Sequence, residues 1–167
     1  MTFTVKQFDD LTPTELYEIV KTRFEIFVLE QKIMCRDLDD VDQVALHVFC
    51  REGGSEDGRI DAGSGGSGAK ADPGGRVTGY LRLFWQDEAA GIAKMGRVVT
   101  LTHGRGIGGE LLRKGIEVAR RQMHARTITL HSQQYCIGYY EREGFVVTSD
   151  VFLEEGIPHV EMELRLD

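Results

Sequence analysis

The chain contains few cysteines and no apolar segment long enough to cross a bilayer. Its three cysteines, Cys35, Cys50 and Cys136, lie far apart, and no CxxC or Cys/His cluster has the spacing of a zinc site. We therefore expect reduced thiols and no bound metal. The N-terminal segment has no basic start followed by an apolar block, which argues against a signal peptide. These absences predict a cytoplasmic protein that does not associate with a membrane.

A surplus of basic residues is also missing. The 20 Lys and Arg residues are outnumbered by 27 Asp and Glu, for a net charge of −7. This balance argues against nucleic acid as a partner and is somewhat better suited to a cationic substrate. With 41% hydrophobic and 28% charged residues, the 167 residues are typical of a globular protein. We expect one domain over residues 1–167.

Hydrophobic periodicity predicts an alternation of strands and helices. The start of the first helix is predicted by Thr12 and Glu15, which have the spacing of a capping box, and by Pro13, which suits the first helical position. Residues 52–75 are rich in Gly, Ser and Asp, and we expect a flexible hairpin loop there. The predicted strands cover residues 2–8, 44–51, 77–85, 92–101, 127–131, 146–152 and 159–166, and the predicted helices cover 13–30, 107–124 and 135–142.

Four glycines within six residues separate the predicted strand 92–101 from the helix that follows. They are Gly104, Gly106, Gly108 and Gly109. A glycine-rich turn at a helix start can direct several backbone N–H groups at a phosphate, aided by the helix dipole and here by Arg105. This pattern predicts a phosphate or pyrophosphate site.

The same glycines formally match the dinucleotide fingerprint G-x-G-x-x-G, but the context differs. The loop follows about 100 residues of mostly antiparallel-looking chain, and the next strand ends His131-Ser132-Gln133, without an acid for a ribose hydroxyl. No Gly-Lys-Ser/Thr follows, which argues against a P-loop. A Rossmann-like nucleotide binder and a loop that serves packing alone remain alternatives.

Three sets of residues resemble the GNAT superfamily of N-acetyltransferases, and in particular its ElaA-like branch. The turn matches the superfamily's Arg/Gln-x-x-Gly-x-Gly/Ala pattern at Gly106 and Gly108, with His103 at the Arg/Gln position. Residues 139–145 resemble its Tyr-Glu-Lys-x-Gly-Phe segment, with Tyr140 in register. The ElaA-like branch is indicated by Arg23 and Gln133 together with segments 27–31, 96–98 and 156–159.

The resemblance implies an α/β fold of the α+β type, the GNAT acyl-CoA N-acyltransferase fold. Its mixed central sheet of about six to seven strands is flanked by helices, and its fourth and fifth strands (here 92–101 and 127–131) are splayed to admit the cofactor acetyl-CoA. It further implies that the backbone at Val98 and Val99 holds the pantetheine arm and that Tyr140 faces the departing sulfur. The pyrophosphate would be held by His103, Gly104, Arg105, Gly106, Ile107, Gly108 and Gly109.

The implied reaction is direct transfer of the acetyl group to a primary amine in a ternary complex. The acceptor is a small-molecule amine or a peptide amine. The fourth strand lacks the glutamate that some GNAT enzymes use as a base, so Glu30, His47 and His159 are the candidates for proton acceptance. Glu30, His47 and Gln133 are candidates for substrate binding. Each of these residues has a structural alternative, as a helix-end carboxylate or a hydrogen-bonded polar group.

Two further residues have chemistry that needs an explanation. Arg97 lies within an apolar strand and, if buried, needs an acidic partner, which Glu30 or an acid among residues 37–42 could supply. Cys136 has no neighbouring base in the sequence to activate it, so we do not expect a nucleophile there.

The missing fourth-strand glutamate and His103 also fit a second hypothesis. In it the protein keeps the fold and binds CoA, but serves as a catalytically weak sensor or partner-binding module. The resemblance is compatible with a homodimer as well, since late GNAT strands often pair between subunits.

Overall fold

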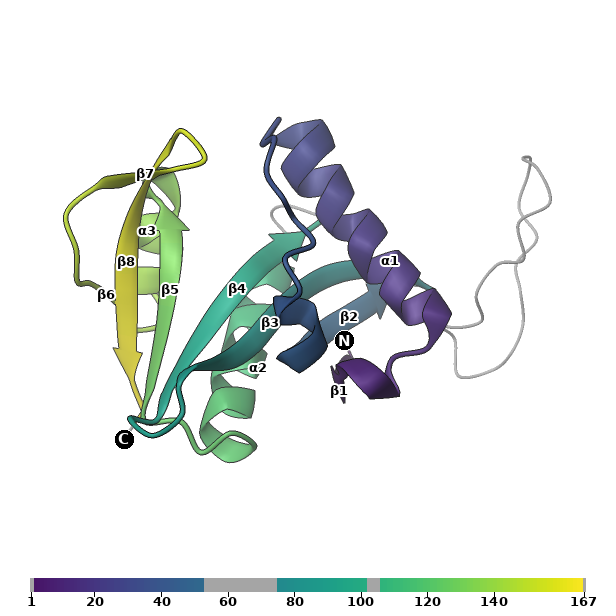
Figure 1. The fold of residues 1–167 in the computed structure, drawn as a ribbon, viewed down its shortest axis with the longest axis horizontal. Helices are drawn as coiled ribbons and strands as arrows, with labels where there is room; N and C mark the ends of the chain where they lie inside the picture. The colour runs from purple at the N-terminus through teal and green to yellow at the C-terminus, as the bar shows by residue number, and fades with distance from the viewer. Residues whose placement is uncertain (1, 53–74, 102–105, 167) are drawn as a thin grey trace.

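The computed structural model describes residues 2–52, 75–101 and 106–166, and these build one eight-stranded sheet with helices on its faces (Figure 1). The strand order is β1-β2-β3-β4-β5-β8-β6, and β7 also pairs with β8. The strands are β1 (Phe3–Gln7), β2 (Leu46–Glu52), β3 (Arg76–Asp87), β4 (Ile92–Thr100), β5 (Thr127–Gln133), β6 (Val146–Val147), β7 (Phe152–Glu154) and β8 (Ile157–Arg165). The main helices are α1 (Pro13–Phe24), α2 (Ile107–Arg121) and α3 (Ile137–Glu141).

The sheet consists of two antiparallel halves joined by one short parallel contact. Strands β1 to β4 pair as antiparallel neighbours, and β5, β8, β6 and β7 form the second half. Strands β4 and β5 pair only from Ile92↔Thr127 to Lys94↔Thr129, although β4 continues to Thr100 and β5 to Gln133. Beyond that contact the two strands diverge in a V, as Figure 1 shows. The predicted splay of the fourth and fifth strands is therefore confirmed.

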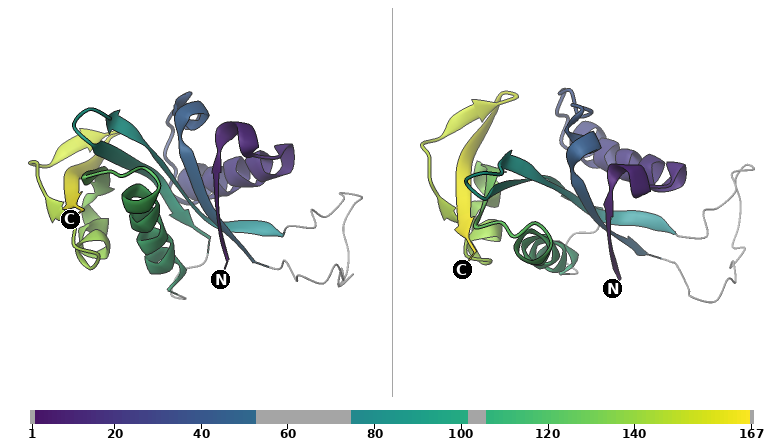
Figure 2. Two further views of the ribbon diagram at one scale, coloured as in Figure 1. Left: turned by 90° about the horizontal axis from the view of Figure 1, so that it is seen from below. Right: turned by 60° about the horizontal axis from the view of Figure 1, so that its bottom comes forward.

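Helix α1 lies on one face of the first half-sheet and α2 on the other (Figure 2). Thr12 and Glu15 form the predicted capping box at the start of α1. The helix does not run regularly to Glu30, because its α-helical part ends at Phe24 and continues as a π-helical turn, η2 (Glu25–Glu30). Ile19 of α1 packs with Phe49 and Tyr80 of the sheet. Among the described residues, no helix is long and apolar enough to span a membrane.

The prediction of one strand over 146–152 is wrong. The chain forms two short strands instead, β6 and β7, and both pair with β8. Between them the Ser149 side chain accepts the β8 amide hydrogen of Glu161 at 2.8 Å, which takes the place of a ladder bond from the backbone. This division accounts for eight strands where about six to seven were expected. The predicted loop over 52–75 lies almost entirely outside the described residues.

Replacing Gly115 with alanine should destabilise the protein, because α2 packs tightly against the sheet at this glycine. A Cβ there would lie 2.8 Å from a Leu81 methyl carbon and 2.9 Å from that of Met95. We expect overpacking to outweigh the better helix propensity and to lower the free energy of unfolding by about 1–2 kcal/mol. Urea unfolding measures this loss. Gly138→Ala is the matched control, since no atom lies within 4 Å of its added Cβ; equal effects of the two substitutions would contradict the prediction.

Candidate active site

The divergence of β4 and β5 opens a cavity of about 410 Å³. Its walls come from η2 and the connection after it, from the middle of β4, from the end of β5, from α3 and the turn before it, and from the β7–β8 turn. Four of the predicted site residues line this one cavity: Val98, Gln133, Tyr140 and His159. The fold thus brings together residues from β4, β5, α3 and β8.

A β-bulge lies in β4 where that strand has separated from β5. Gly96 pairs with Arg82 and Val99 pairs with Tyr80, so Arg97 and Val98 together face a single β3 residue. Arg97 has a positive φ of 55°, which few non-glycine residues adopt. Val98 lines the cavity, whereas the Val99 side chain is buried in the core beneath α1. The bulge therefore turns the backbone at Val98 out of the regular β3–β4 register, beside the cavity.

The glycine-rich turn ends at the start of α2. Gly106 is the N-cap residue with a φ of 76°, and no side-chain hydrogen bond caps this helix within the described residues. Ile107 is buried, and the first turn continues with Gly108 and Gly109. The predicted phosphate contacts at His103, Gly104 and Arg105 lie outside the described residues. In the part that is described, the amide groups at the start of α2 face no competing side-chain acceptor, as an anion site requires.

Tyr140 is buried, and its ring lies edge-on to Tyr139 and Phe145 at centroid distances of 4.9 and 5.9 Å. Within the described residues its hydroxyl makes no hydrogen bond, and the residue lines the cavity. Burial raises the pKa of Tyr140 far above its ordinary value. The side chain is thus a neutral hydrogen-bond donor at physiological pH, with its donor available to a ligand.

Gln133 and His159 face each other across β5 and β8, and both line the cavity. The Gln133 amide donates to Gln31 Oε1 at 3.2 Å and so connects β5 to the end of η2. His159 Nδ1 lies 2.8 Å from the Ile157 carbonyl oxygen, which can only accept. In the neutral ring Nδ1 therefore carries the hydrogen and Nε2 has a lone pair, with Glu154 Oε2 at 3.6 Å.

Sequence reasoning missed His131 and Glu154, yet both line the cavity beside His159. His131 Nε2 lies 3.1 Å from the Lys94 ammonium, which can only donate, so Nδ1 donates to Glu154 Oε1 at 2.9 Å. This hydrogen bond lowers the pKa of Glu154. Residues 131, 133 and 159 share one sheet face, but that is visible only once the β5–β8 register is known.

Glu30 and His47 lie apart from these residues. Glu30 is exposed at the end of η2 and is not part of the cavity wall. It lies close enough to Tyr135 to influence it, because burial raises the Tyr135 pKa and the Glu30 charge raises it further. His47 is fully buried, with ring nitrogens 2.9 Å from the Tyr80 hydroxyl and 2.9 Å from the Asp42 carbonyl oxygen. Burial lowers the His47 pKa. This geometry favours a structural function for His47 over the predicted contact with substrate.

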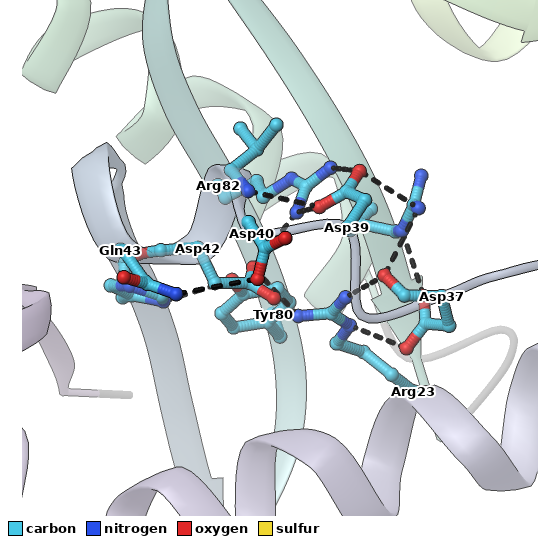
Figure 3. A network of polar contacts seen from close by, with 11 residues as sticks. Arg23, Asp37, Asp39, Asp40, Asp42, Gln43, Tyr80 and Arg82 are labelled. Atoms are coloured by element: carbon cyan, nitrogen blue, oxygen red, sulfur yellow. Dashed lines mark hydrogen bonds and ion pairs between the residues drawn. The ribbon is translucent and has the colours of Figure 1, made fainter.

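Arg97 is half-buried, and the acidic partners that the described residues give it come from 37–42, one of the two predicted sources. Its Nε lies 2.8 Å from Asp37 Oδ1, and its Nη2 lies 3.3 Å from Asp39 Oδ2. These contacts belong to a network in which three arginines and three aspartates alternate (Figure 3). The network comprises Arg23, Arg82, Arg97, Asp37, Asp39 and Asp42.

The network should make stability depend on pH in the acid range. Burial raises the Asp39 pKa, but the hydrogen bond and charge of Arg82 outweigh it and bring the pKa from 3.8 down to about 2. A carboxyl whose pKa is lower in the folded state contributes stability above its unfolded value and loses it as the pH falls. We expect the urea midpoint to fall between about pH 4 and pH 2, and less steeply in Asp39→Asn. Exposed Asp40, whose carboxylate binds Gln43, provides the control Asp40→Asn; the same flattening there would contradict the assignment.

Cys136 also lines the cavity. Burial raises the pKa of its thiol, so the reactive thiolate is disfavoured. Cys35, on the opposite wall, has its pKa raised by burial as well. The raised pKa is consistent with the expectation that Cys136 is not a nucleophile.

Known proteins resemble this chain along almost its whole length. Residues 41–166 match the family described as acetyltransferase (GNAT) domain. A UPF0039 protein of Schizosaccharomyces pombe is 31% identical over 98% of this chain and 97% of its own, and the protein ElaA of Escherichia coli is 25% identical over 92% of this chain and 89% of its own. The crystal structure of an acyl-CoA N-acyltransferase from Pseudomonas aeruginosa superposes with a TM-score of 0.76 at 31% identity, covering 98% of this chain and 99% of that one. With its parallel β4–β5 contact and splayed sheet, the chain belongs to the GNAT acetyltransferase family, among relatives that include ElaA and the UPF0039 proteins.

Proposed function

We propose that this protein transfers an acetyl group from acetyl-CoA to a primary amine by direct attack in a ternary complex. The observation that carries the proposal is the placement of one cavity between the β4 bulge and the separated end of β5. The acceptor is a small-molecule amine or a peptide amine. We also propose a cytoplasmic location, consistent with the free thiols of Cys35, Cys50 and Cys136.

The residues present fit a CoA ester. The start of α2, where no side chain of the described residues caps the helix, suits the pyrophosphate, with Gly106, Ile107, Gly108 and Gly109 as the described part of the cradle. The gap between β4 and β5 leaves backbone hydrogen-bonding groups available to a pantetheine arm at Val98 and Val99. Bound acetyl-CoA would supply the activated acyl group and the thiolate leaving group.

Residues on the cavity wall supply the hydrogen bonds and the proton acceptor. In this proposal the backbone at Val98 donates to the thioester carbonyl, and the Tyr140 hydroxyl donates to the sulfur as its charge develops. His159 Nε2 takes the proton from the attacking amine, directly or through water, and Glu154 Oε2 lies 3.6 Å from that nitrogen. Gln133 hydrogen-bonds the acceptor, and Glu30, exposed at the end of η2, attracts its positive charge.

Release of free thiol from acetyl-CoA in the presence of an amine panel tests this proposal. Calorimetric titration with CoA and, in parallel, with NAD(H) identifies which cofactor binds. Turnover with at least one primary amine supports acetyl transfer. Tight CoA binding without turnover of any amine would favour the alternative of a CoA sensor or partner-binding module, which the absence of a carboxylate on β4 still motivates.

A further inference from the structure

We infer that Asp37 is a positioning residue that holds the β4 bulge in its left-handed conformation through Arg97, and thereby fixes the backbone at Val98. The inference rests on the proposed function in one respect, namely that the bulge backbone binds the acyl-CoA. The residues that carry it are Arg23 on α1, Asp37 on the connection after η2, and Arg97 in β4. None of the three is predicted to contact the acetyl group.

Asp37 joins the two arginines with every acceptor it has. Its Oδ1 accepts from Arg97 Nε at 2.8 Å, and its Oδ2 accepts from Arg23 Nε at 3.0 Å. Its backbone carbonyl oxygen accepts from both guanidinium groups, at 2.7 Å from Arg23 and 3.1 Å from Arg97. Because Arg23 is only 1% exposed and lies on α1, it provides a fixed point from which Asp37 holds Arg97.

The bulge needs such support because of the residue found there. At a φ of 55° the backbone of glycine is unstrained, whereas that of a residue with an L side chain is strained. Strain of this kind persists only where the surrounding structure over-determines it. Here the guanidinium of Arg97 is held by Asp37 and Asp39 and lies over the Phe27 ring, 6.0 Å from its centroid. The contacts that hold the side chain therefore also hold the backbone.

A purely stabilising ion pair would behave differently from a positioning one at residue 97. If the ion pair only adds stability, Arg97→Ala and Arg97→Gly both remove it, and alanine is the better strand residue of the two. If the ion pair maintains the positive φ, glycine adopts that conformation without help, whereas alanine resists it. Arg97→Gly should then retain more activity than Arg97→Ala, whereas a purely stabilising ion pair would favour Arg97→Ala.

The experiment compares kcat and KM for acetyl-CoA in Arg97→Gly, Arg97→Ala, Asp37→Asn and the double variant Arg97→Gly/Asp37→Asn. We expect Arg97→Gly to keep kcat/KM about tenfold above Arg97→Ala, since small misplacements at a reacting centre are costly. Asp37→Asn should lower kcat/KM about tenfold in the natural background and less than about threefold when glycine is at position 97.

Glu15 offers a matched control. It is a buried carboxylate that also joins two cations, Lys6 at 2.8 Å and Arg51 at 3.2 Å, but it lies away from the cavity. Glu15→Gln should lower stability and leave kcat/KM within about twofold, because neither Glu15 nor its partners Lys6 and Arg51 line the cavity. This separates a general loss of stability from a loss of positioning.

Two results would overturn the inference. One is an Arg97→Ala variant as active as Arg97→Gly, and the other is an equal loss of kcat/KM on Asp37→Asn with arginine or glycine at position 97. Urea unfolding of the two Arg97 variants decides the same question without any ligand, since a maintained positive φ makes the alanine variant the less stable one. If Arg97→Ala is more stable than Arg97→Gly, the inference is overturned even if Asp37→Asn fails to fold. If the unaltered protein neither binds acetyl-CoA nor turns over an amine, the proposed function fails, while the unfolding comparison still judges the positioning role.

Discussion

Replacement of Tyr140 with phenylalanine should lower kcat by about 100-fold while leaving the affinity for CoA almost unchanged. The hydroxyl lies at the cavity with no partner within the described residues, so its removal leaves no protein group unsatisfied. The phenyl ring keeps the edge-on contacts with Tyr139 and Phe145. What is lost is a hydrogen bond to the departing sulfur, which matters only as charge develops there.

Steady-state thiol release and calorimetric CoA binding measure the two quantities separately. Tyr139→Phe is the matched control, because the Tyr139 hydroxyl donates to the Gly108 carbonyl oxygen at the start of α2. That substitution should weaken CoA binding more than it changes kcat. Unaltered kcat in Tyr140→Phe would remove Tyr140 from the mechanism.

The direction of the Tyr140 pKa shift limits its role. A tyrosine whose pKa is raised by burial is a poor proton donor to a thiolate, since the transfer becomes more uphill than for a solvated phenol. Hydrogen bonding to the developing charge needs no such transfer. The rate should therefore show no titration of Tyr140 below about pH 10, and a basic limb that disappears in Tyr140→Phe would contradict this role.

The elements that the sequence predicted best are those whose signals are local. The capping box at Thr12 and Glu15 needs only residues three apart. The glycine before α2 predicts a turn from the local sequence alone, without regard to tertiary contacts. The split of the predicted strand 146–152 depends instead on Ser149 binding an amide of β8, twelve residues away. No propensity within that segment contains this information.

Site residues divide in the same way. Tyr140 and Gln133 could be chosen because they belong to segments that resemble a known family, and both line the cavity. His131 and Glu154 could not, because their meeting depends on how β5 and β7 each pair with β8. His47 was a reasonable candidate by residue type, but its burial against Tyr80 is a property of tertiary packing.

Replacement of Arg23 with methionine should destabilise the protein far more than the loss of an exposed ion pair. The guanidinium is 1% exposed and binds Asp37 and Asp42, with its Nη1 2.8 Å from Asp42 Oδ1. Methionine fills much of the same volume, so the main loss is electrostatic: two carboxylates lose a buried counter-charge. We expect the free energy of unfolding to fall by about 3–5 kcal/mol.

Urea unfolding with an unchanged m-value measures that loss as a shift of the midpoint alone. Arg113→Met provides the comparison, because Arg113 binds Glu143 at a similar distance of 2.7 Å but is 57% exposed. Solvent screening should limit its effect to less than about 1 kcal/mol. A similar loss in both variants would show that burial does not set the strength of the Arg23 contacts. The anchor from which Asp37 holds the β4 bulge would then be no firmer than a surface ion pair.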